Sequence, residues 1–199
     1  MGLRILEAGC GRRCQSDTPR DAHVVGLDID ETGLALNDRL DERIVADIES
    51  ADLPRDAFDR IVCHDVLEHL PRPIVALDNL VGSLAPGGEL RLGLPNVASR
   101  KSLVAKFTPH SFHVLVYRML GRENAGRPGY APFPTYLRWS LRQAALERWA
   151  QDRGLDILES RKESGGAFNG RPVLRRLVGS ASELRLVLRK PGGPWGSGS

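Results

Sequence analysis

The sequence predicts an α/β fold, a doubly wound sheet of seven mostly parallel strands with helices against its faces. Three observations predict it. Short apolar runs alternate with helix-like stretches through the first half of the chain. A glycine-rich turn directly follows the first of these runs. Two further strand-like runs close the chain. Its 199 residues suffice for one sizeable domain, and 41% hydrophobic and 27% charged residues are ordinary for a soluble globular protein.

The strands come first. Each is an apolar run too short for a helix, and several end in glycine, proline or aspartate. The five runs of the first half are residues 4–9, 23–30, 42–49, 58–65 and 88–95.

Two helices are predicted between these strands, at 31–40 and 72–84. In the second, apolar residues recur at helical spacing, and "APGG" (85–88) then ends the helix. Those apolar residues are Ile74, Leu77, Leu80, Val81 and Leu84. Strands that alternate with helices imply parallel pairing.

The second half breaks this rhythm. Residues 96–135 are expected to form a helical insertion, which would act as a lid. A longer helix follows at about 135–152, and strands are expected at 155–163 and 183–190. The helix carries an apolar stripe at spacing four: Leu137, Leu141, Ala145 and Trp149. We therefore expect a single domain over 1–190 and a flexible tail over 191–199.

Composition excludes several classes of protein. No apolar run approaches the ~20 residues of a membrane span, and no signal peptide is recognisable at the start, so we expect a cytoplasmic protein. The three cysteines lack partners at metal-ligand spacing, so no metal site is expected.

The net charge of +3 divides into −8 over residues 1–95 and +11 over 96–199. The two halves can neutralise each other, or the second half can offer a basic face to an anionic substrate.

The glycine turn, "EAGCG" (7–11), indicates a nucleoside-containing ligand. Ligands of doubly wound sheets bind beyond the carboxyl ends of the strands. Glycine there lets the backbone approach the ligand closely. Asp28 ends the second strand, 17 residues after Gly11, where an acid can bind both hydroxyls of a ribose.

The same turn disfavours a dinucleotide. A dinucleotide site needs a third small residue and a firm helix behind it to hold the pyrophosphate. Here Cys14 occupies that position, and the following "QSDTPRDA" is a poor helix former because of Pro19 and its aspartates. A cofactor without phosphate needs only the close backbone approach and the ribose acid.

Four motifs stand out along the chain: "ILEAGCGR", "VVGLDID", "VADIESADLPRDAFDRIVCHDVLEHLPRP" and "LAPGGELRLGLPN". In their order and approximate spacing, they resemble the motifs of class I S-adenosylmethionine-dependent methyltransferases. The resemblance covers about residues 3–96. The "DVLEHL" and "PGG" forms are similar to the small-molecule branch that acts in ubiquinone biosynthesis. The resemblance implies a Rossmann-like methyltransferase fold and S-adenosyl-L-methionine as cofactor, with S-adenosyl-L-homocysteine as product.

The resemblance also implies which residues bind the cofactor. Residues of the glycine turn would line its methionine part, Asp28 the ribose and Ile29 the adenine. Asp47 would accept a hydrogen bond from the adenine amino group, with Ile48 beside the ring. The full set is Glu7, Gly9, Cys10, Gly11, Asp28, Ile29, Asp47, Ile48, His64 and Asp65.

The sequence departs from the family in two ways. The family usually has a small residue at Arg13 and a firm helix after it, and it usually has helices before the first strand. Here the chain begins at that strand. Either another segment provides the cover, for which the insertion at 96–135 is the natural candidate, or the true start lies further upstream, or the site is more open than is usual in the family.

Histidines are the candidates for catalysis, because an oxygen acceptor is often helped by a general base near neutral pH. The catalytic candidates are His64, at the end of the fourth strand, and His110 and His113, in the insertion. His23 starts a strand and is interpreted as structural. His69 is interpreted mainly as closing a local helix or pairing with Glu68.

The acceptor is expected to be a small molecule methylated on oxygen. Basic residues of the insertion suit an anionic acceptor, and its aromatic residues suit a planar one; both sets can equally be surface or core. Those aromatic residues are Tyr117, Tyr130, Phe133 and Tyr136. Alternatives are an RNA or protein methyltransferase and a cofactor-binding subunit without its own activity. Nucleic acid is disfavoured because no RNA-binding module is present, and a homodimer is left open.

Overall fold

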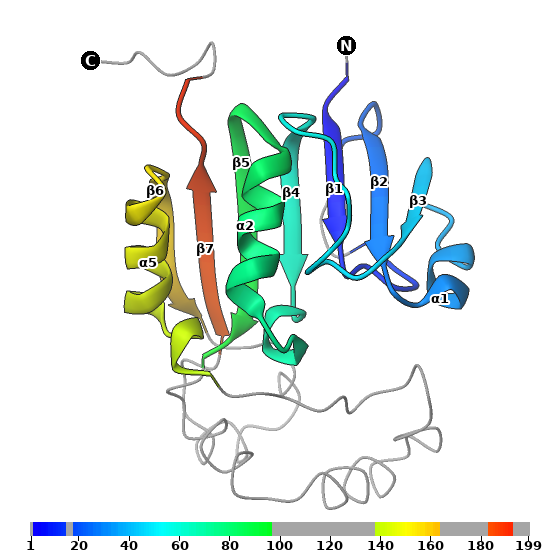
Figure 1. The fold of residues 1–199 in the computed structure, drawn as a ribbon. Helices are drawn as coiled ribbons and strands as arrows, with labels where there is room; N and C mark the ends of the chain where they lie inside the picture. Colours follow the sequence, from blue (N-terminus) through cyan, green and yellow to red (C-terminus); the bar gives the residue numbers. More distant parts are fainter. Residues whose placement is uncertain (1, 15–17, 97–137, 164–182, 193–199) are drawn as a thin grey trace, which may run out of the picture.

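A seven-stranded sheet forms the centre of the molecule in the computed structural model, which describes residues 2–14, 18–96, 138–163 and 183–192 (Figure 1). The strands are β1 (Arg4–Ala8), β2 (His23–Asp28), β3 (Glu42–Val45), β4 (Phe58–His64), β5 (Leu84–Pro95), β6 (Asp156–Glu163) and β7 (Glu183–Arg189). The helical elements are α1 (Glu31–Ala35), η1 (Leu67–His69), α2 (Pro73–Ser83), η2 (Trp139–Leu141) and α5 (Gln143–Asp152). Every strand predicted from the sequence is present, and the predicted fold class is confirmed.

The strand order is β3-β2-β1-β4-β5-β7-β6, and the order of the chain reverses between β1 and β4. Strands β1 to β5 pair in parallel, whereas β7 runs antiparallel to both of its neighbours. The carboxyl ends of β1, β2 and β4 therefore meet at one edge, on either side of the switch point. This is the edge where α/β sheets bind ligands.

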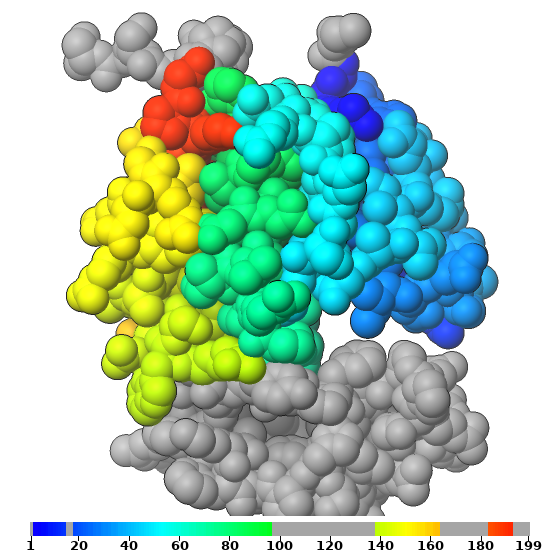
Figure 2. Space-filling model, viewed as in Figure 1, coloured from blue at the N-terminus to red at the C-terminus, as the bar shows by residue number. Residues whose placement is uncertain are grey.

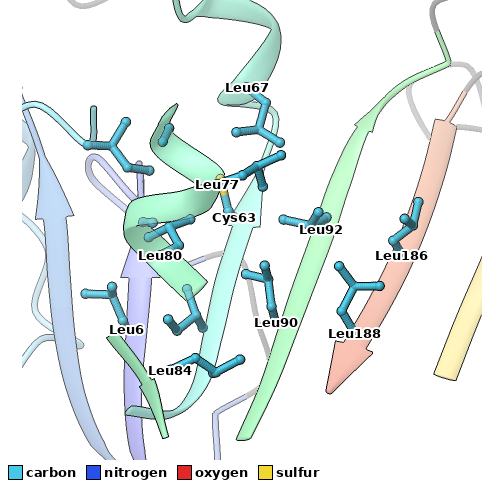
Figure 3. Packing of buried hydrophobic residues seen from close by; sticks show 14 of the residues in the cluster. Leu6, Cys63, Leu67, Leu77, Leu80, Leu84, Leu90, Leu92, Leu186 and Leu188 are labelled. Carbon is cyan, nitrogen blue, oxygen red and sulfur yellow. The ribbon is translucent and has the colours of Figure 1, made fainter. Parts of the chain in front are cut away.

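The core lies between the sheet and α2 (Figure 3). Pro73 opens the helix at a position where its missing N–H costs nothing. Leu77 and Leu80 then point toward the sheet, in one buried cluster with Leu6, Cys63 and the leucines of β5 and β7. Burial of this apolar surface is the main term that holds the sheet and helix together.

A loop from Ala46 to Ala57 crosses in front of β1 and leads into β4 (Figure 1). With α2 it forms a continuous layer over this face of the sheet (Figure 2). Asn79 of α2 fixes the loop, because its side-chain amide donates to the carbonyls of Ile48 (3.0 Å) and Ala51 (2.9 Å). Arg72 binds Glu49, which is 7% exposed, with its Nε 3.0 Å from Oε2. These contacts hold the loop at the carboxyl edge of the sheet.

Two details differ from the sequence prediction. Residues 85–88 do not separate a helix from a strand; they lie within β5, where Gly87 has φ +80° and the pairing with β4 shifts register. The predicted helix at 135–152 is, in its described part, a short 3₁₀ turn and then α5. Leu141 lies in that turn, so the buried residues of α5 are Leu146, Trp149 and Ala150, and Ala145 is only half-buried. Of the predicted stripe, Leu141 and Trp149 are buried but belong to different helical elements, Ala145 is only half-buried, and Leu137 lies outside the described residues.

Within the described residues, no helix is long and apolar enough to cross a membrane.

Candidate functional site

The glycine turn that follows β1 bends back over the end of β2. Gly9 donates its N–H to the carbonyl of Leu27 at 2.7 Å, which ties the turn to the neighbouring strand. Gly9 has φ +73° and Gly11 φ +49°. Both values lie in the left-handed region, which costs a residue with a Cβ about 1–2 kcal/mol. Residues with a Cβ would therefore not form this turn as easily.

The two glycines have different second roles. A Cβ on Gly9 would lie 2.2 Å from Cγ2 of Val66, so the missing side chain lets the segment after β4 pack against the turn. Among the described residues, a Cβ on Gly11 would meet only Oδ2 of Asp28, at 3.8 Å. The backbone at Gly11 is therefore open to a ligand on the side where the carboxylate of Asp28 lies.

Asp28 is held in a fixed orientation at the end of β2. Its Oδ2 accepts the N–H of Gly11 at 2.8 Å and its Oδ1 accepts the N–H of Asp30 at 2.9 Å. Each carboxylate oxygen keeps a further lone pair for a ligand hydroxyl. Ile29 is next to it and is 74% exposed, which is unusual for an isoleucine and provides an apolar surface beside the acid.

Asn37 supports the turn from below, and it is not among the residues predicted from the sequence. The residue is 1% exposed, and its amide donates to the carbonyl of Gly11 at 3.3 Å. Gly33 brings α1 close to the same place, since a Cβ there would lie 3.3 Å from the carbonyl carbon of Gly11. The available signal was an asparagine late in a predicted helix, a position that asparagine disfavours.

Asp47 lies in the loop after β3, at the same edge of the sheet. Its side chain is exposed, and Oδ1 accepts the N–H of Glu49 at 2.8 Å. The following Ile48 is only 6% exposed and belongs to the main core. Ile48 therefore supports the loop more than it faces the surface.

Glu7 and Cys10 lie beneath the turn. Glu7 is 1% exposed and Cys10 5%. Burial, then the nearby Cys14, Asp28 and Glu7, raise the pKa of the Cys10 thiol to about 12. The thiol is therefore protonated at neutral pH and is a poor nucleophile. All three cysteines of the chain are free.

His64 and Asp65 end β4 on the other side of the switch point. Asp65 has φ +54°, a strained value for a residue with a side chain, and its N–H donates to the carbonyl of Gly93 at 2.8 Å. The imidazole of His64 lies against Gly93, where a Cβ would approach to 2.8 Å of Cδ2. Burial lowers the pKa of His64, while Asp65 and Glu7 oppose that shift. His64 is therefore neutral at pH 7.

Glu68 is a second residue of this edge that is not among the site residues predicted from the sequence. It lies in η1, is 3% exposed, and its Oε2 has no hydrogen-bond partner. Burial raises the pKa of its carboxyl to about 8, and Asp65 adds to the shift. The oxygen Oε1 lies 3.9 Å from Nε2 of His69. An acid followed by histidine within "DVLEHL" was the signal, but only the fold shows that the carboxyl is buried.

The fold therefore brings most of the predicted residues to one edge. The residues before and after the ends of β1, β2, β3 and β4 include Glu7, Gly9, Cys10, Gly11, Asp28, Ile29, Asp47, His64 and Asp65. His110, His113 and all but Asn96 of the insertion at 96–135 lie outside the described residues. Their predicted roles, and a homodimer, stay predictions.

The chemistry of this edge fits a cationic nucleoside without phosphate. Acids predominate, Asp28 presents a carboxylate suited to two hydroxyls, and Ile29 presents an apolar surface beside it. The turn leaves its backbone open at Gly11, and the described residues after it form no helix whose N-terminus could hold a pyrophosphate. S-adenosylmethionine has these properties: a sulfonium, an ammonium, a ribose and an adenine.

Comparison with known proteins agrees. Residues 2–160 match the model of a family described as a methyltransferase domain. The ubiquinone biosynthesis O-methyltransferase of Leptothrix cholodnii is 29% identical over 187 residues, which cover 88% of this chain and 71% of that protein. The protein of the same name from Dechloromonas aromatica is 27% identical, over 94% of this chain and 78% of its own length.

A solved structure of similar fold is that of an S-adenosylmethionine-dependent methyltransferase from Methanosarcina mazei. It superposes with a TM-score of 0.64 at 17% identity and covers 96% of this chain and 94% of its own. Because the family model matches most of the chain, the chain belongs to the methyltransferase domain family and is an S-adenosylmethionine-dependent methyltransferase.

Proposed function

We propose that the protein transfers the methyl group of S-adenosylmethionine to an oxygen atom of a small molecule. The observation that carries the proposal is the pair formed by Gly11 and Asp28, an open glycine backbone bonded to an oriented carboxylate at the switch point. The two relatives above are named as O-methyltransferases, which supports oxygen as the atom that is methylated.

The cofactor-binding roles follow from position. Asp28 would accept the ribose hydroxyls, because both of its oxygens are already oriented by backbone N–H groups. Ile29 would pack on the adenine, and Asp47 would accept from its amino group. Glu7, Gly9, Cys10 and Gly11 would surround the methionine part, and Ile48 would support the loop that carries Asp47.

When bound, S-adenosylmethionine supplies an electrophilic methyl group on a positively charged sulfur. The chain's own residues would hold the acceptor in line with that methyl, since positioning is the main contribution to such a transfer. His64 suits the position beside the cofactor because burial keeps its imidazole neutral at pH 7, so it adds no positive charge. A neutral imidazole can also accept a proton from an oxygen acceptor.

The residues that would recognise an aromatic or anionic acceptor lie in the insertion. An aromatic ring or an acidic group on the acceptor is part of this proposal on the basis of sequence alone. His110 and His113 are, on the same basis, further candidates for contact with the acceptor.

The cofactor site can be tested by calorimetry with S-adenosylhomocysteine. We expect Asp28→Ala to weaken binding by at least about 100-fold, since it removes two charged hydrogen bonds of about 1.5–3 kcal/mol each and frees the turn. Asp38→Ala, which removes an exposed carboxylate, is the matched control and should bind as the unchanged protein does. Equal affinity in both variants would refute the assignment.

The methylated atom can be identified with a cofactor that carries ¹³C in the transferred methyl group. The protein is incubated with a mixture of small phenols, carboxylic acids, amines and thiols, and the products are read by NMR. The carbon shift separates O-methyl from N-methyl and S-methyl. Label found only on nitrogen or sulfur would contradict the proposal.

A further inference from the structure

We propose that Arg185 and Arg91, on the face of the sheet opposite α2, bind an acidic group of the methyl acceptor, a carboxylate or a phosphate. The inference rests on the proposed function and deepens it, because it assigns one end of the acceptor to residues of the described chain. The site lies beside His64, toward the carboxyl edge of β4 and β5.

The two faces of the sheet differ in chemistry over β5 and β7. On the face under α2, the leucines of both strands are at most 2% exposed and form one buried cluster with the helix. Successive side chains of a strand alternate between faces, so Arg91 and Arg185 lie on the other face, which is turned away in Figure 1. Their side chains are 39% and 50% exposed, so a ligand can reach both.

The strand register brings Arg185 to the neighbourhood of His64. Gly93 of β5 pairs with His64 on one side and with Arg185 on the other. Because Gly93 has no side chain, the imidazole of His64 fills the space where a Cβ would lie, 2.8 Å from Cδ2. The ring therefore lies over β5, on the same face as Arg185 and Arg91.

The charges on this face agree with that placement. Burial is the main cause of the lowered pKa of His64, and the positive charges of Arg185 and Arg91 add to the shift, against the two acids named above. Burial also lowers the pKa of Arg60, on the same face of β4, and Arg91 adds to that shift as well. A bound anion would relieve the repulsion among these groups.

Acids on the same strands and their neighbours orient both guanidinium groups. Nε of Arg185 donates to Oε2 of Glu163 at 2.9 Å. Arg91 donates to Glu89 from Nε at 3.3 Å and from Nη2 at 2.9 Å. These contacts use only part of the five N–H donors of each guanidinium. An oriented guanidinium can bind a carboxylate or a phosphate through two parallel hydrogen bonds, at a smaller loss of entropy.

The position of Arg185 limits the shape of the acceptor. Two strand spacings separate β4 from β7 at this level, about 10 Å. An acceptor with its acidic group on Arg185 can therefore bring a hydroxyl to the end of β4 only if the two groups lie at opposite ends of the molecule. A phenol with an acidic group para to its hydroxyl has this shape.

Binding of the acidic group can be tested without methyl transfer. The protein is labelled with ¹⁵N-arginine, saturated with S-adenosylhomocysteine, and titrated with para-hydroxyphenylacetate, its neutral amide or para-hydroxyphenyl phosphate. The Nε resonances of Arg185 and Arg91 should move with at least one of the two anions and stay unmoved with the amide. The anion that binds more tightly identifies the acidic group. Resonances that respond to neither anion, or equally to the amide, would overturn the proposal.

Variants assign the binding to Arg185. Arg185→Gln should weaken binding of the anion about 10-fold, which is the loss expected for one charged hydrogen bond. The matched control is Arg148→Gln, which changes an exposed arginine of α5 and should bind the anion as the unchanged protein does. Equal losses in the two variants would show non-specific attraction to positive charge and contradict the site.

Methyl transfer provides a second readout. In Arg185→Gln the KM for the anionic phenol should rise about 10-fold, while the KM for the amide and the affinity for S-adenosylhomocysteine stay unchanged. Glu183 lies two residues before Arg185 on the same face, and its charge opposes an anion there. Glu183→Gln should therefore lower the KM for the anionic phenol and leave that for the amide unchanged.

Two outcomes separate this inference from the proposed function. If the anionic phenol and its amide are both methylated on oxygen and Arg185→Gln changes neither KM, the anion site is wrong and O-methylation stands. If the anionic phenol binds at Arg185 but the transferred methyl appears only on nitrogen or sulfur of other acceptors, O-methylation is wrong and the anion site stands.

Discussion

The two sides of the switch point are built differently. After β1 and β2, three hydrogen bonds fix the turn. The N–H of Gly9 donates to the carbonyl of Leu27, the N–H of Gly11 to the carboxylate of Asp28, and the side-chain amide of Asn37 to the carbonyl of Gly11. After β4, the chain carries a strained aspartate, a buried histidine with a lowered pKa and a buried acid with a raised one. The first side has fixed donors and acceptors of the kind that a binding surface needs, whereas the second side carries backbone strain and shifted pKa values of the kind that cluster at catalytic sites.

The sharpest way to break the contact between the two sides is Gly9→Ala. The new Cβ would lie 2.2 Å from Val66 and would also occupy φ +73°. Overpacking costs about 1–3 kcal/mol, and the left-handed backbone adds about 1–2 kcal/mol. We expect the free energy of unfolding, measured by urea denaturation, to fall by about 2–5 kcal/mol.

A double-mutant cycle isolates the contact. In a Val66→Ala background the added methyl of Gly9→Ala should cost less, because the overlap is relieved while the backbone strain remains. The same penalty in both backgrounds would show that Val66 does not pack against the turn.

A smaller effect is expected from Asn37→Ala on the binding side. The variant leaves the carbonyl of Gly11 without its amide donor, in a place where Asn37 itself is fully buried. Loss of one such bond costs about 1–2 kcal/mol, and calorimetry should show S-adenosylhomocysteine binding about 10-fold more weakly.

Ser83→Ala is the matched control for that experiment. Ser83 is equally buried and donates to the carbonyl of Leu80 at 2.9 Å, at the far end of α2. It should lose stability without losing affinity. If Asn37→Ala destabilises the fold and leaves affinity unchanged, Asn37 serves the fold alone.

The sequence was sufficient for the side that binds and insufficient for the side proposed to react. Apolar runs and a glycine turn predict strands and their carboxyl edge, because these patterns are local. The role of Asn37 could not be predicted, because the sequence pattern places it inside a helix, whereas α1 ends at Ala35. Its role depends instead on a tertiary hydrogen bond to Gly11. The contact between His64 and Gly93 depends on the pairing of β4 with β5, whose register shifts after Phe58. No local pattern contains that shift.

On the reacting side, Gly93→Ala should move the imidazole of His64. The added Cβ would lie 2.8 Å from Cδ2, so the ring must shift. Because small displacements of a reacting group are costly, we expect kcat to fall about 10-fold with affinity for S-adenosylhomocysteine within about twofold. The ¹³C-histidine spectrum should show a displaced His64 resonance.

Gly82→Ala provides the control for this change. It adds the same methyl group in α2, where no atom of the described ranges lies within 4 Å of the new Cβ. It should leave the His64 resonance and kcat unchanged and raise stability slightly, as alanine does in a helix. An unmoved His64 resonance in Gly93→Ala would contradict the contact.

The smallest expected effect is on the pH dependence of stability. Burial lowers the pKa of His64 from its ordinary value of about 6.5. Below that value the unfolded chain binds a proton that the folded chain resists, so unfolding becomes easier as the pH falls from about 7 toward the folded pKa. His64→Gln removes this term. We therefore measure the free energy of unfolding of both proteins in urea at pH 5, 6, 7 and 8. As the pH falls, the free energy of unfolding of the variant should rise relative to that of the unchanged protein. A constant difference across this range would mean that the fold does not lower the pKa of His64, contrary to its burial.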